Sequence, residues 1–310
     1  MGIPAQPLCA SNKSAGSFAF VSWGLLMRRF LVALIAAMST VASSLIGHAA
    51  DMPVKAPVAV AAPAYNWTGF YIGANIGGGW GSRSVNYTPN DPATSFYFSP
   101  AGFGGAPPSG SFTTSGVIGG LQLGYNWQFN RNWLVGLETD FNWSGMKGSG
   151  SSSGAILAII PFTASVDEQI KWFGTVRARL GYLPADNLLV YVTGGLAYGK
   201  VDHSGSYVNN SAFAATIPNI GGFSVFCNPG TCLAGSSSDV ATGWTVGGGL
   251  EFALWKNITL KAEYLYVSLG SKSLTETALR PFPGTLPGSF NANYDSTNFN
   301  VGRVGVNYRF

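Results

Sequence analysis

The chain has 310 residues, of which 46% are hydrophobic, 14% aromatic and only 10% charged. Because soluble proteins carry about 25% charged residues, this composition excludes an ordinary cytoplasmic protein as well as a disordered chain. No apolar run in the bulk of the chain is long enough for a membrane-spanning helix. A membrane protein of this composition must therefore be a closed β-barrel, which satisfies its backbone hydrogen bonds in lipid.

The N-terminal part has the pattern of a secretory leader. Met27 is followed by two arginines, an apolar stretch at 30–38 and small residues up to Ala49 and Ala50. This order predicts a signal peptide within an N-terminal segment 1–50, with the natural start at Met27 and cleavage near 49–50. Residues 51–66 are rich in Pro and Ala and are expected to form a periplasmic linker. The domain itself is expected over 67–310.

Removal of the leader also changes the charge. It takes away Lys13, Arg28 and Arg29 and no acidic residue, so the formal net charge falls from +4 to +1. The basicity of the full chain therefore gives no argument for nucleic-acid binding.

Eight segments alternate between apolar and polar residues with period two, as strands with one apolar face do. The last of them ends the chain: Val304, Val306, Tyr308 and Phe310 fall on one face, opposite a polar face. The predicted strands are 67–79, 115–128, 132–143, 169–183, 188–200, 240–255, 258–269 and 298–310.

The connections between these strands alternate in length. Three are short, and four are long and rich in Gly, Ser, Asn, Thr and Pro, at 81–114, 144–168, 201–239 and 270–297. Short turns on one rim and long loops on the other are typical of outer-membrane barrels, with periplasmic turns and extracellular loops. The sequence therefore predicts an all-β protein, an eight-stranded antiparallel up-and-down transmembrane β-barrel with its apolar faces toward lipid.

Charged residues recur on the faces that would line the lumen. They are Glu138, Asp140, Lys171, Arg177, Arg179, Glu251, Lys261, Glu263, Arg303 and Arg309. Eight strands leave an interior just wide enough for side chains, and buried charges must be paired. An ion-pair network that fills the lumen is therefore favoured over a charged, gated pore.

The remaining reactive residue types are few. Cys227 and Cys232 frame a turn sequence and predict a local disulfide in an exported protein. His203 is the only histidine after the leader, in a predicted loop near Ser204 and Ser206. A catalytic use of His203 would need a coupled nucleophile and an orienting group, which the sequence does not supply. We therefore predict no enzyme, no cofactor and no metal site.

Several motifs together resemble a known family. They include the segments 67–80, 119–126, 175–182 and 191–199, and the terminal Tyr-Arg-Phe. These resemble the small outer-membrane β-barrel proteins of alphaproteobacteria, called porin family or outer-membrane immunogenic proteins, with the barrel architecture of OmpA. The resemblance implies the outer membrane of a Gram-negative bacterium, surface exposure and a role in envelope integrity. It also implies haem binding for some relatives, but it transfers no set of functional residues.

The combined hypothesis is a structural barrel with a filled lumen and a surface-interaction role. A narrow general diffusion porin is the alternative, and a surface receptor that binds haem or another ligand through its loops is the third. The expected partners are outer-membrane lipids, lipopolysaccharide and the outer-membrane insertion machinery. The C-terminal strand, with Tyr308 and Phe310, resembles the assembly signal that this machinery reads.

Overall fold

The computed structural model describes residues 65–99, 109–156 and 160–310. The predicted leader, the cleavage site and most of the linker lie outside these residues. In the part of the chain that the structure describes, no helix is long and apolar enough to cross a membrane.

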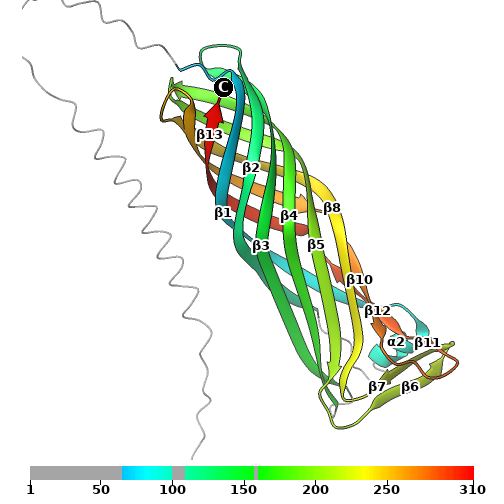
Figure 1. The fold of residues 1–310 in the computed structure, drawn as a ribbon. Helices are drawn as coiled ribbons and strands as arrows, with labels where there is room; N and C mark the ends of the chain where they lie inside the picture. Colours follow the sequence, from blue (N-terminus) through cyan, green and yellow to red (C-terminus); the bar gives the residue numbers. More distant parts are fainter. Residues whose placement is uncertain (1–64, 100–108, 157–159) are drawn as a thin grey trace, which may run out of the picture. The chain divides into compact units, whose positions relative to one another are not determined.

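Eight antiparallel strands form a closed ring, because the first pairs with the last as well as with the second (Figure 1). In ring order they are β1 (Gly69–Pro89), β2 (Gly110–Gln128), β3 (Trp133–Ile156), β4 (Ile160–Ala185), β5 (Leu188–Asn209), β8 (Gly230–Ala253), β9 (Ile258–Leu269) and β13 (Thr297–Arg309). All eight predicted strands are present, and the up-and-down antiparallel order is confirmed.

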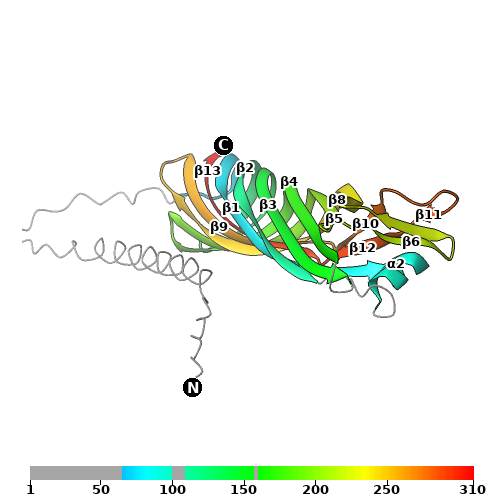
Figure 2. The same ribbon diagram turned by 90° about the horizontal axis from the view of Figure 1, so that it is seen from below.

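The ring continues far beyond the predicted strands. β10 (Lys272–Ala278) follows β9 and pairs with β8, and β12 (Ser289–Tyr294) leads into β13 and pairs with β1. At the tip lie α2 (Pro92–Phe98), β6 (Ala215–Ile220), β7 (Phe223–Cys227) and β11 (Leu286–Pro287), at the opposite end from the C-terminus (Figure 2). We call the part of the barrel beyond the exterior tryptophans Trp80, Trp143, Trp172 and Trp244 the extension.

Part of the loop prediction was wrong, because strands of the extension occupy residues that were expected to form loops. Segment 144–168 was expected to be a long loop, but β3 and β4 pair from Met146↔Ile170 out to Ile156↔Ile160. The short connections at the other rim are confirmed, since only a few residues separate β2 from β3, β4 from β5, and β8 from β9.

The polarity of the wall inverts where the extension begins. Below the tryptophans, exposed residues are apolar, such as Val117, Leu137 and Leu196, each more than 60% exposed. In the extension the exposed faces are polar instead. There Asn293 accepts a hydrogen bond from Ser273 and donates one to Thr88. The lower half is therefore built for an apolar surrounding and the extension for water.

The interior is layered, as the inward residues of β4 show. From the short-turn end they pass from an apolar layer through charges to a second apolar layer, a single acid and the apolar core of the extension. In that order the residues are Leu183, Arg179, Arg177, Phe173, Ile170, Glu168, Val166, Ala164 and Phe162, all less than 6% exposed.

Candidate functional site

A layer of charged side chains crosses the interior of the lower half, and we call it the charged layer. It contains four carboxylates and four cationic groups: Glu138, Asp140, Glu251, Glu263, Arg177, Arg179, Lys261 and Arg303. Each residue is at most 5% exposed. Strand alternation positions them, because each lies an even number of residues from an inward neighbour on its own strand.

Contacts in the charged layer span the lumen. β3 and β9 lie opposite each other in the ring, four strands apart in either direction. Even so, Lys261 Nζ on β9 donates to Glu138 Oε1 on β3 over 2.9 Å. Arg303 Nη2 on β13 reaches Asp140 Oδ2 on β3 over 2.7 Å, and Arg177 Nη1 on β4 reaches Glu263 Oε1 on β9 over 3.0 Å.

Neutral polar groups complete the layer. Tyr71 Oη donates to Glu138 Oε2 over 2.7 Å, and Tyr191 Oη donates to Glu263 Oε1 over 2.9 Å. The amide of Asn307 accepts from Gln122 Nε2 over 2.6 Å and donates to Glu251 Oε1 over 2.8 Å. Such bonds reduce the cost of burying charge because they satisfy the remaining oxygen and nitrogen atoms.

Inward glycines make room for the large side chains of the layer. A Cβ atom on Gly124 would collide with the Tyr71 ring, and one on Gly249 would lie 2.7 Å from Tyr191 Oη. Larger residues at these two positions would displace the tyrosines from the carboxylates that they contact.

Two predicted lumen residues lie elsewhere. Lys171 is on the outside, because the pairing register of β4 shifts between Ile170 and Trp172 and inserts one extra residue. Its side chain is 43% exposed and lies 3.5 Å from Asp202 on β5. The prediction of Lys171 as an inward residue was wrong, since simple alternation does not allow for a bulge.

Arg309 is on the inner face but outside the charged layer. Its guanidinium lies 4.2 Å from the centre of the Tyr65 ring, near the short-turn end. Among the described residues, its Nε and Nη1 atoms have no hydrogen-bond partner. Arg309 is therefore held by an aromatic ring, and the predicted ion pair is not present.

The extension holds a second ion pair, which the sequence analysis did not identify. Arg83 Nε on β1 donates to Glu168 Oε1 on β4 over 3.0 Å, with both side chains fully buried. His203 Nε2 lies 3.4 Å from Glu168 Oε2. Glu168 and Arg83 both lie in segments that were predicted to be loops. Continuing the alternation of inward residues on β1 beyond Gly77 would nevertheless have placed Arg83 inside.

The position of His203 shows whether this residue could act as a catalytic base for a neighbouring serine. The imidazole is buried and packs 4.5 Å from the Tyr294 ring, whereas Ser204 and Ser206 lie on the outward face of the same strand. Neither serine can therefore pair with His203 as a nucleophile, because neighbouring residues of a strand point to opposite sides.

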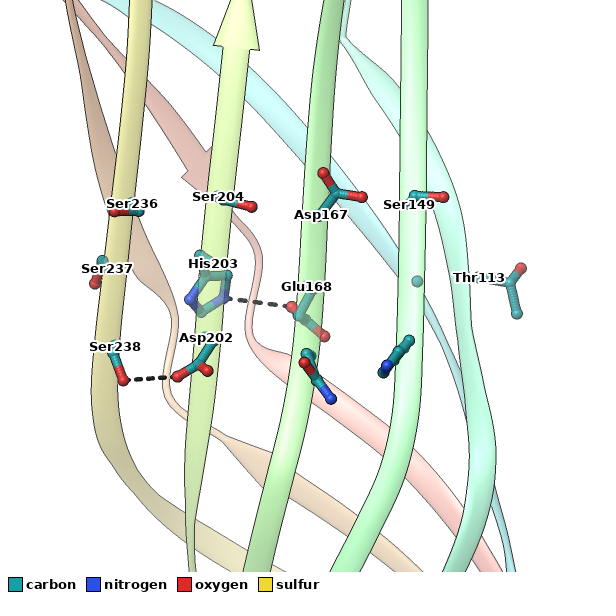
Figure 3. Close-up of a pocket in the computed structure, with 13 residues that line it drawn as sticks. Thr113, Ser149, Asp167, Glu168, Asp202, His203, Ser204, Ser236, Ser237 and Ser238 are labelled. Atoms are coloured by element: carbon teal, nitrogen blue, oxygen red, sulfur yellow. Dashed lines mark hydrogen bonds and ion pairs between the residues drawn. The ribbon is translucent and has the colours of Figure 1, made fainter.

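Just beyond the exterior tryptophans, a polar groove of about 970 Å³ crosses the outside of β3, β4, β5 and β8 (Figure 3). Its outward side chains form two rows, because the strands pair in register. The rows are Ser149, Asp167, Ser204 and Ser236, and Lys147, Gln169, Asp202 and Ser238. Ser238 Oγ donates to Asp202 Oδ1 over 2.6 Å. Hydroxyls, amides and carboxylates at this density suit a hydrated, hydroxyl-rich ligand.

One buried carboxyl group in the extension, that of Glu276, lacks a hydrogen-bond partner among the described residues. Glu276 lies on β10 and is 1% exposed. Burial raises the pKa of Glu276 to about 8.

At the tip, a disulfide joins Cys227 and Cys232. Within the described ranges, no group of three or more His, Cys, Asp or Glu side chains could hold a metal ion.

The closed ring, its apolar exterior and its charged interior define a transmembrane β-barrel. Residues 41–310 match the outer membrane protein beta-barrel domain family, and the chain belongs to that family. It is therefore a protein of the outer membrane of a Gram-negative bacterium, with the short turns periplasmic and the extension extracellular.

The relatives confirm the resemblance to alphaproteobacterial outer-membrane proteins. The chain is 36% identical over 289 residues to the 31 kDa outer-membrane immunogenic protein of Brucella melitensis, covering 92% of this chain and 100% of the relative. It is 29% identical over 260 residues to the 22 kDa outer membrane protein of Rhizobium leguminosarum bv. viciae, covering 84% and 83%.

Solved barrels are similar at a coarse level. Outer membrane protein OprG from Pseudomonas aeruginosa aligns with a TM-score of 0.39 and 11% identity, over 78% of this chain and 96% of that one. Ail of Yersinia pestis aligns with a TM-score of 0.31 and 15% identity, over 78% and 99%. Scores this low support no argument about the present chain.

Proposed function

We propose that the protein is a structural outer-membrane barrel whose lumen is filled by an ion-pair network and whose extension carries the surface interactions. The contact between Lys261 and Glu138 carries the proposal, since it joins opposite strands of the ring. Side chains that meet across an eight-stranded barrel leave no continuous water column at that height. Apolar layers above and below the charges support the same function.

Planar-bilayer conductance of the refolded protein tests the filled lumen. We expect no sustained open channels at moderate voltage. The double variant Glu138→Gln/Lys261→Met removes the cross-lumen pair and tests whether that pair keeps the lumen closed. Lys171→Met, on the outside of the barrel, is its matched control. Sustained channels in the wild-type protein would falsify the filled lumen and favour the alternative, a narrow diffusion porin.

Binding of haem through the loops is the third candidate. The burial of His203, its contact with Glu168 and its packing against Tyr294 oppose a role as haem ligand, because the ring would have to leave these neighbours. Haem titration of the wild type and of His203→Ala tests this. A spectral change in the wild type that is lost in the variant would revive the receptor function.

Lipopolysaccharide is the partner that the groove of Figure 3 fits best. Lys147, Lys171 and Lys200 lie on three consecutive strands at the outer membrane boundary, next to the hydroxyl-lined rows. Cationic groups beside sugar-binding hydroxyls match a phosphorylated glycolipid headgroup. Retention on immobilised lipopolysaccharide should fall in Lys147→Gln/Lys171→Gln, but not in Lys256→Gln at the periplasmic rim. Equal retention of all three proteins would contradict the assignment.

Export and assembly belong to the same proposal. We infer removal of segment 1–50, a periplasmic linker at 51–66 and a barrel from 67 to 310, which N-terminal sequencing of the mature protein tests. Tyr308 and Phe310 are 48% and 74% exposed on the outer face of β13. Deletion of Phe310 should lower surface levels through poor insertion, whereas Leu279→Ala in the extension should not. Normal surface levels of the Phe310 truncation would contradict the assembly signal.

The proposed role in envelope integrity rests on the position of the barrel, which spans the membrane and projects its extension from the outer surface. A strain that lacks the protein should become more sensitive to detergent, and full detergent resistance would contradict the role. Complementation with the wild-type gene should restore resistance.

A further inference from the structure

The wall of the extension is interrupted between β8 and β10. β8 pairs with β9 as far as Gly243↔Leu269, and pairing resumes with β10 only at Ala234↔Thr277. A backbone hydrogen bond from Gly270 N to Thr242 O over 3.2 Å follows the last β8–β9 pair, and Gly235 lies beside Thr275, but no ladder pair joins residues 236–241 to residues 271–274. The other junctions of β8 differ, since its pairing with β5 extends along nearly the whole strand.

Inner-face residues are exposed at this interruption. Asp239 pairs with the inward Val201, and Lys272 pairs with the inward Tyr294, so both belong to the lining of the barrel. Their side chains are nevertheless 42% and 40% exposed. Lys272 Nζ lies 3.0 Å from Asp239 Oδ2, so the two side chains form a clasp across the opening.

A cavity of about 300 Å³ occupies the interruption and passes from the outer to the inner face of the wall. Val240 on the outer face is 58% exposed, whereas Val201, His203 and Thr297 on the inner face are 1%, 4% and 2% exposed. The buried imidazole of His203 lines the cavity; its Nε2 lies 3.4 Å from Glu168 Oε2, and its Nδ1 has no hydrogen-bond partner among the described residues. This volume lies at the lower end of the range of small-molecule pockets.

The opening lies at the outer edge of the membrane. Trp244 is on β8, four residues from Val240 and 52% exposed on the lipid-facing side, as expected for an interfacial anchor. At about 3.3 Å per residue along a strand tilted by about 40°, the opening lies roughly 10 Å beyond Trp244 along the membrane normal. It is therefore above the hydrocarbon, at the level where the polar heads of membrane amphiphiles meet water.

The lining defines the chemistry of a ligand. Val201, Val240 and Ala241 offer apolar contact, while Thr242, Ser271 and His203 offer hydrogen bonds. The only two charged groups among the lining residues, Asp239 and Lys272, neutralise each other. An ionic ligand would have to break that pair, and an anion would also meet Glu168 beside His203.

We propose that the interruption between β8 and β10 is a lateral binding site for small uncharged amphiphiles, in which His203 hydrogen-bonds a hydroxyl or carbonyl head and the apolar body lies against Val201 and Val240. The site opens through the wall of the extension, beyond the charged layer. It is therefore independent of the conductance that tests the filled lumen.

The imidazole signal of His203 provides a direct test, with 1-octanol as the probe. The full chain, labelled with ¹³C-histidine in lipid nanodiscs, is titrated with octanol, and loss of the signal in His203→Gln identifies it. We expect a shift of the His203 signal that saturates. A shift that grows linearly with octanol, or no shift, overturns the proposal, because it reports only general partitioning into lipid.

A matched pair of variants locates the binding. Ser271→Trp fills the cavity and should abolish the saturable shift. Ser273→Trp adds the same bulk to an exposed serine of β10 that does not line the cavity, and should retain the shift. Both variants must migrate like the wild type on a gel of unboiled sample. Equal shifts in the two variants overturn the assignment of the site.

A chemical measurement on the wild type avoids any loss of folding. Diethyl pyrocarbonate modifies accessible imidazoles, and peptide mapping separates His203 from His48. Saturating octanol should slow modification of His203, and Lys272→Met, which releases the clasp, should accelerate it. Modification that octanol leaves unchanged overturns the proposal.

Discussion

The two halves of this barrel fill the same narrow lumen in opposite ways. In the membrane half, charges and amides lie inside and apolar side chains outside. In the extension, Phe162, Tyr207 and Phe290 lie inside, and hydroxyls and amides outside. Six strands, β1, β2, β3, β4, β5 and β8, run through both halves, so the pattern follows the surroundings of each half and not the strand geometry. In each half, the interior side chains are therefore opposite in polarity to the side chains that face the surroundings.

The largest difference should come from the charged layer. Arg177→Met removes one of the two arginines that Glu138, Asp140 and Glu263 share, the other being Arg303, and loss of one partner of a buried ion pair costs about 3–5 kcal/mol. Urea unfolding in lipid vesicles measures the loss. Lys171→Met, on the same strand but outside, should change stability by less than about 0.5 kcal/mol. A similar loss in both variants would remove the distinction between inner and outer charges.

Asn307 in the membrane half and Asn293 in the extension allow a direct comparison of a buried and an exposed side chain. Asn307 is 1% exposed and serves Gln122 and Glu251, so Asn307→Ala should destabilise the barrel by about 1–3 kcal/mol. Asn293 makes as many side-chain bonds on the outside of the extension, where water replaces them. Asn293→Ala should cost about 0.5 kcal/mol or less. The same unfolding assay ranks them, and the reverse order would contradict the inverted polarity.

At the tip, the disulfide should matter locally. Cys227 and Cys232 are five residues apart, and closing so short a loop contributes about 2 kcal/mol by the chain-entropy relation. The Cys227→Ser/Cys232→Ser variant should be cleaved faster by protease between 210 and 235 and should keep its gel migration. A change in migration would mean that the tip and the membrane half unfold together.

The last comparison concerns the pH dependence of the extension. Burial holds the pKa of Glu276 at about 8, above the ordinary value of 4.5, so the folded state binds a proton that the unfolded state releases. Stability is therefore full below about pH 4.5 and falls by about 1.4 kcal/mol per pH unit up to about pH 8. Hydrogen exchange of the β10 and β12 amides, corrected for intrinsic rates, measures this fall.

Glu276→Gln is the control for that dependence. It keeps the shape of the side chain and cannot ionise, so its exchange should show no loss of protection between pH 5 and pH 8. Protection in the membrane half should be independent of pH in both proteins. A wild-type extension that is equally protected at both pH values would place the Glu276 carboxylate in contact with water.

The sequence predicted the membrane half well because its alternation is strong there. Val304, Val306 and Tyr308 against Arg303 and Asn307 leave only one way to orient β13. Glu138 and Arg177, both predicted to face the lumen, pair directly across β3 and β4.

The extension was missed for a physical reason. Beyond the tryptophans the outward residues turn polar, and β3 becomes a run of Gly and Ser at 148–154 that is typical of loops. Its strand conformation depends on pairing with β4, where Phe162 lies opposite Gly154, and on the apolar core that Phe162 forms with the distant Tyr207 and Phe290. Lys171 was misplaced for a different reason, because a single inserted residue reverses every later inward position until the register recovers.

The order of the charged residues along the chain has a consequence for biogenesis. Glu138 and Asp140 come early, whereas Lys261 and Arg303 come with the last two strands of the ring. Without β9 and β13, the layer holds three carboxylates, those of Glu138, Asp140 and Glu251, against two cations, Arg177 and Arg179. The last two strands of the ring add Lys261, Glu263 and Arg303, so closure of the barrel brings the charged layer to neutrality.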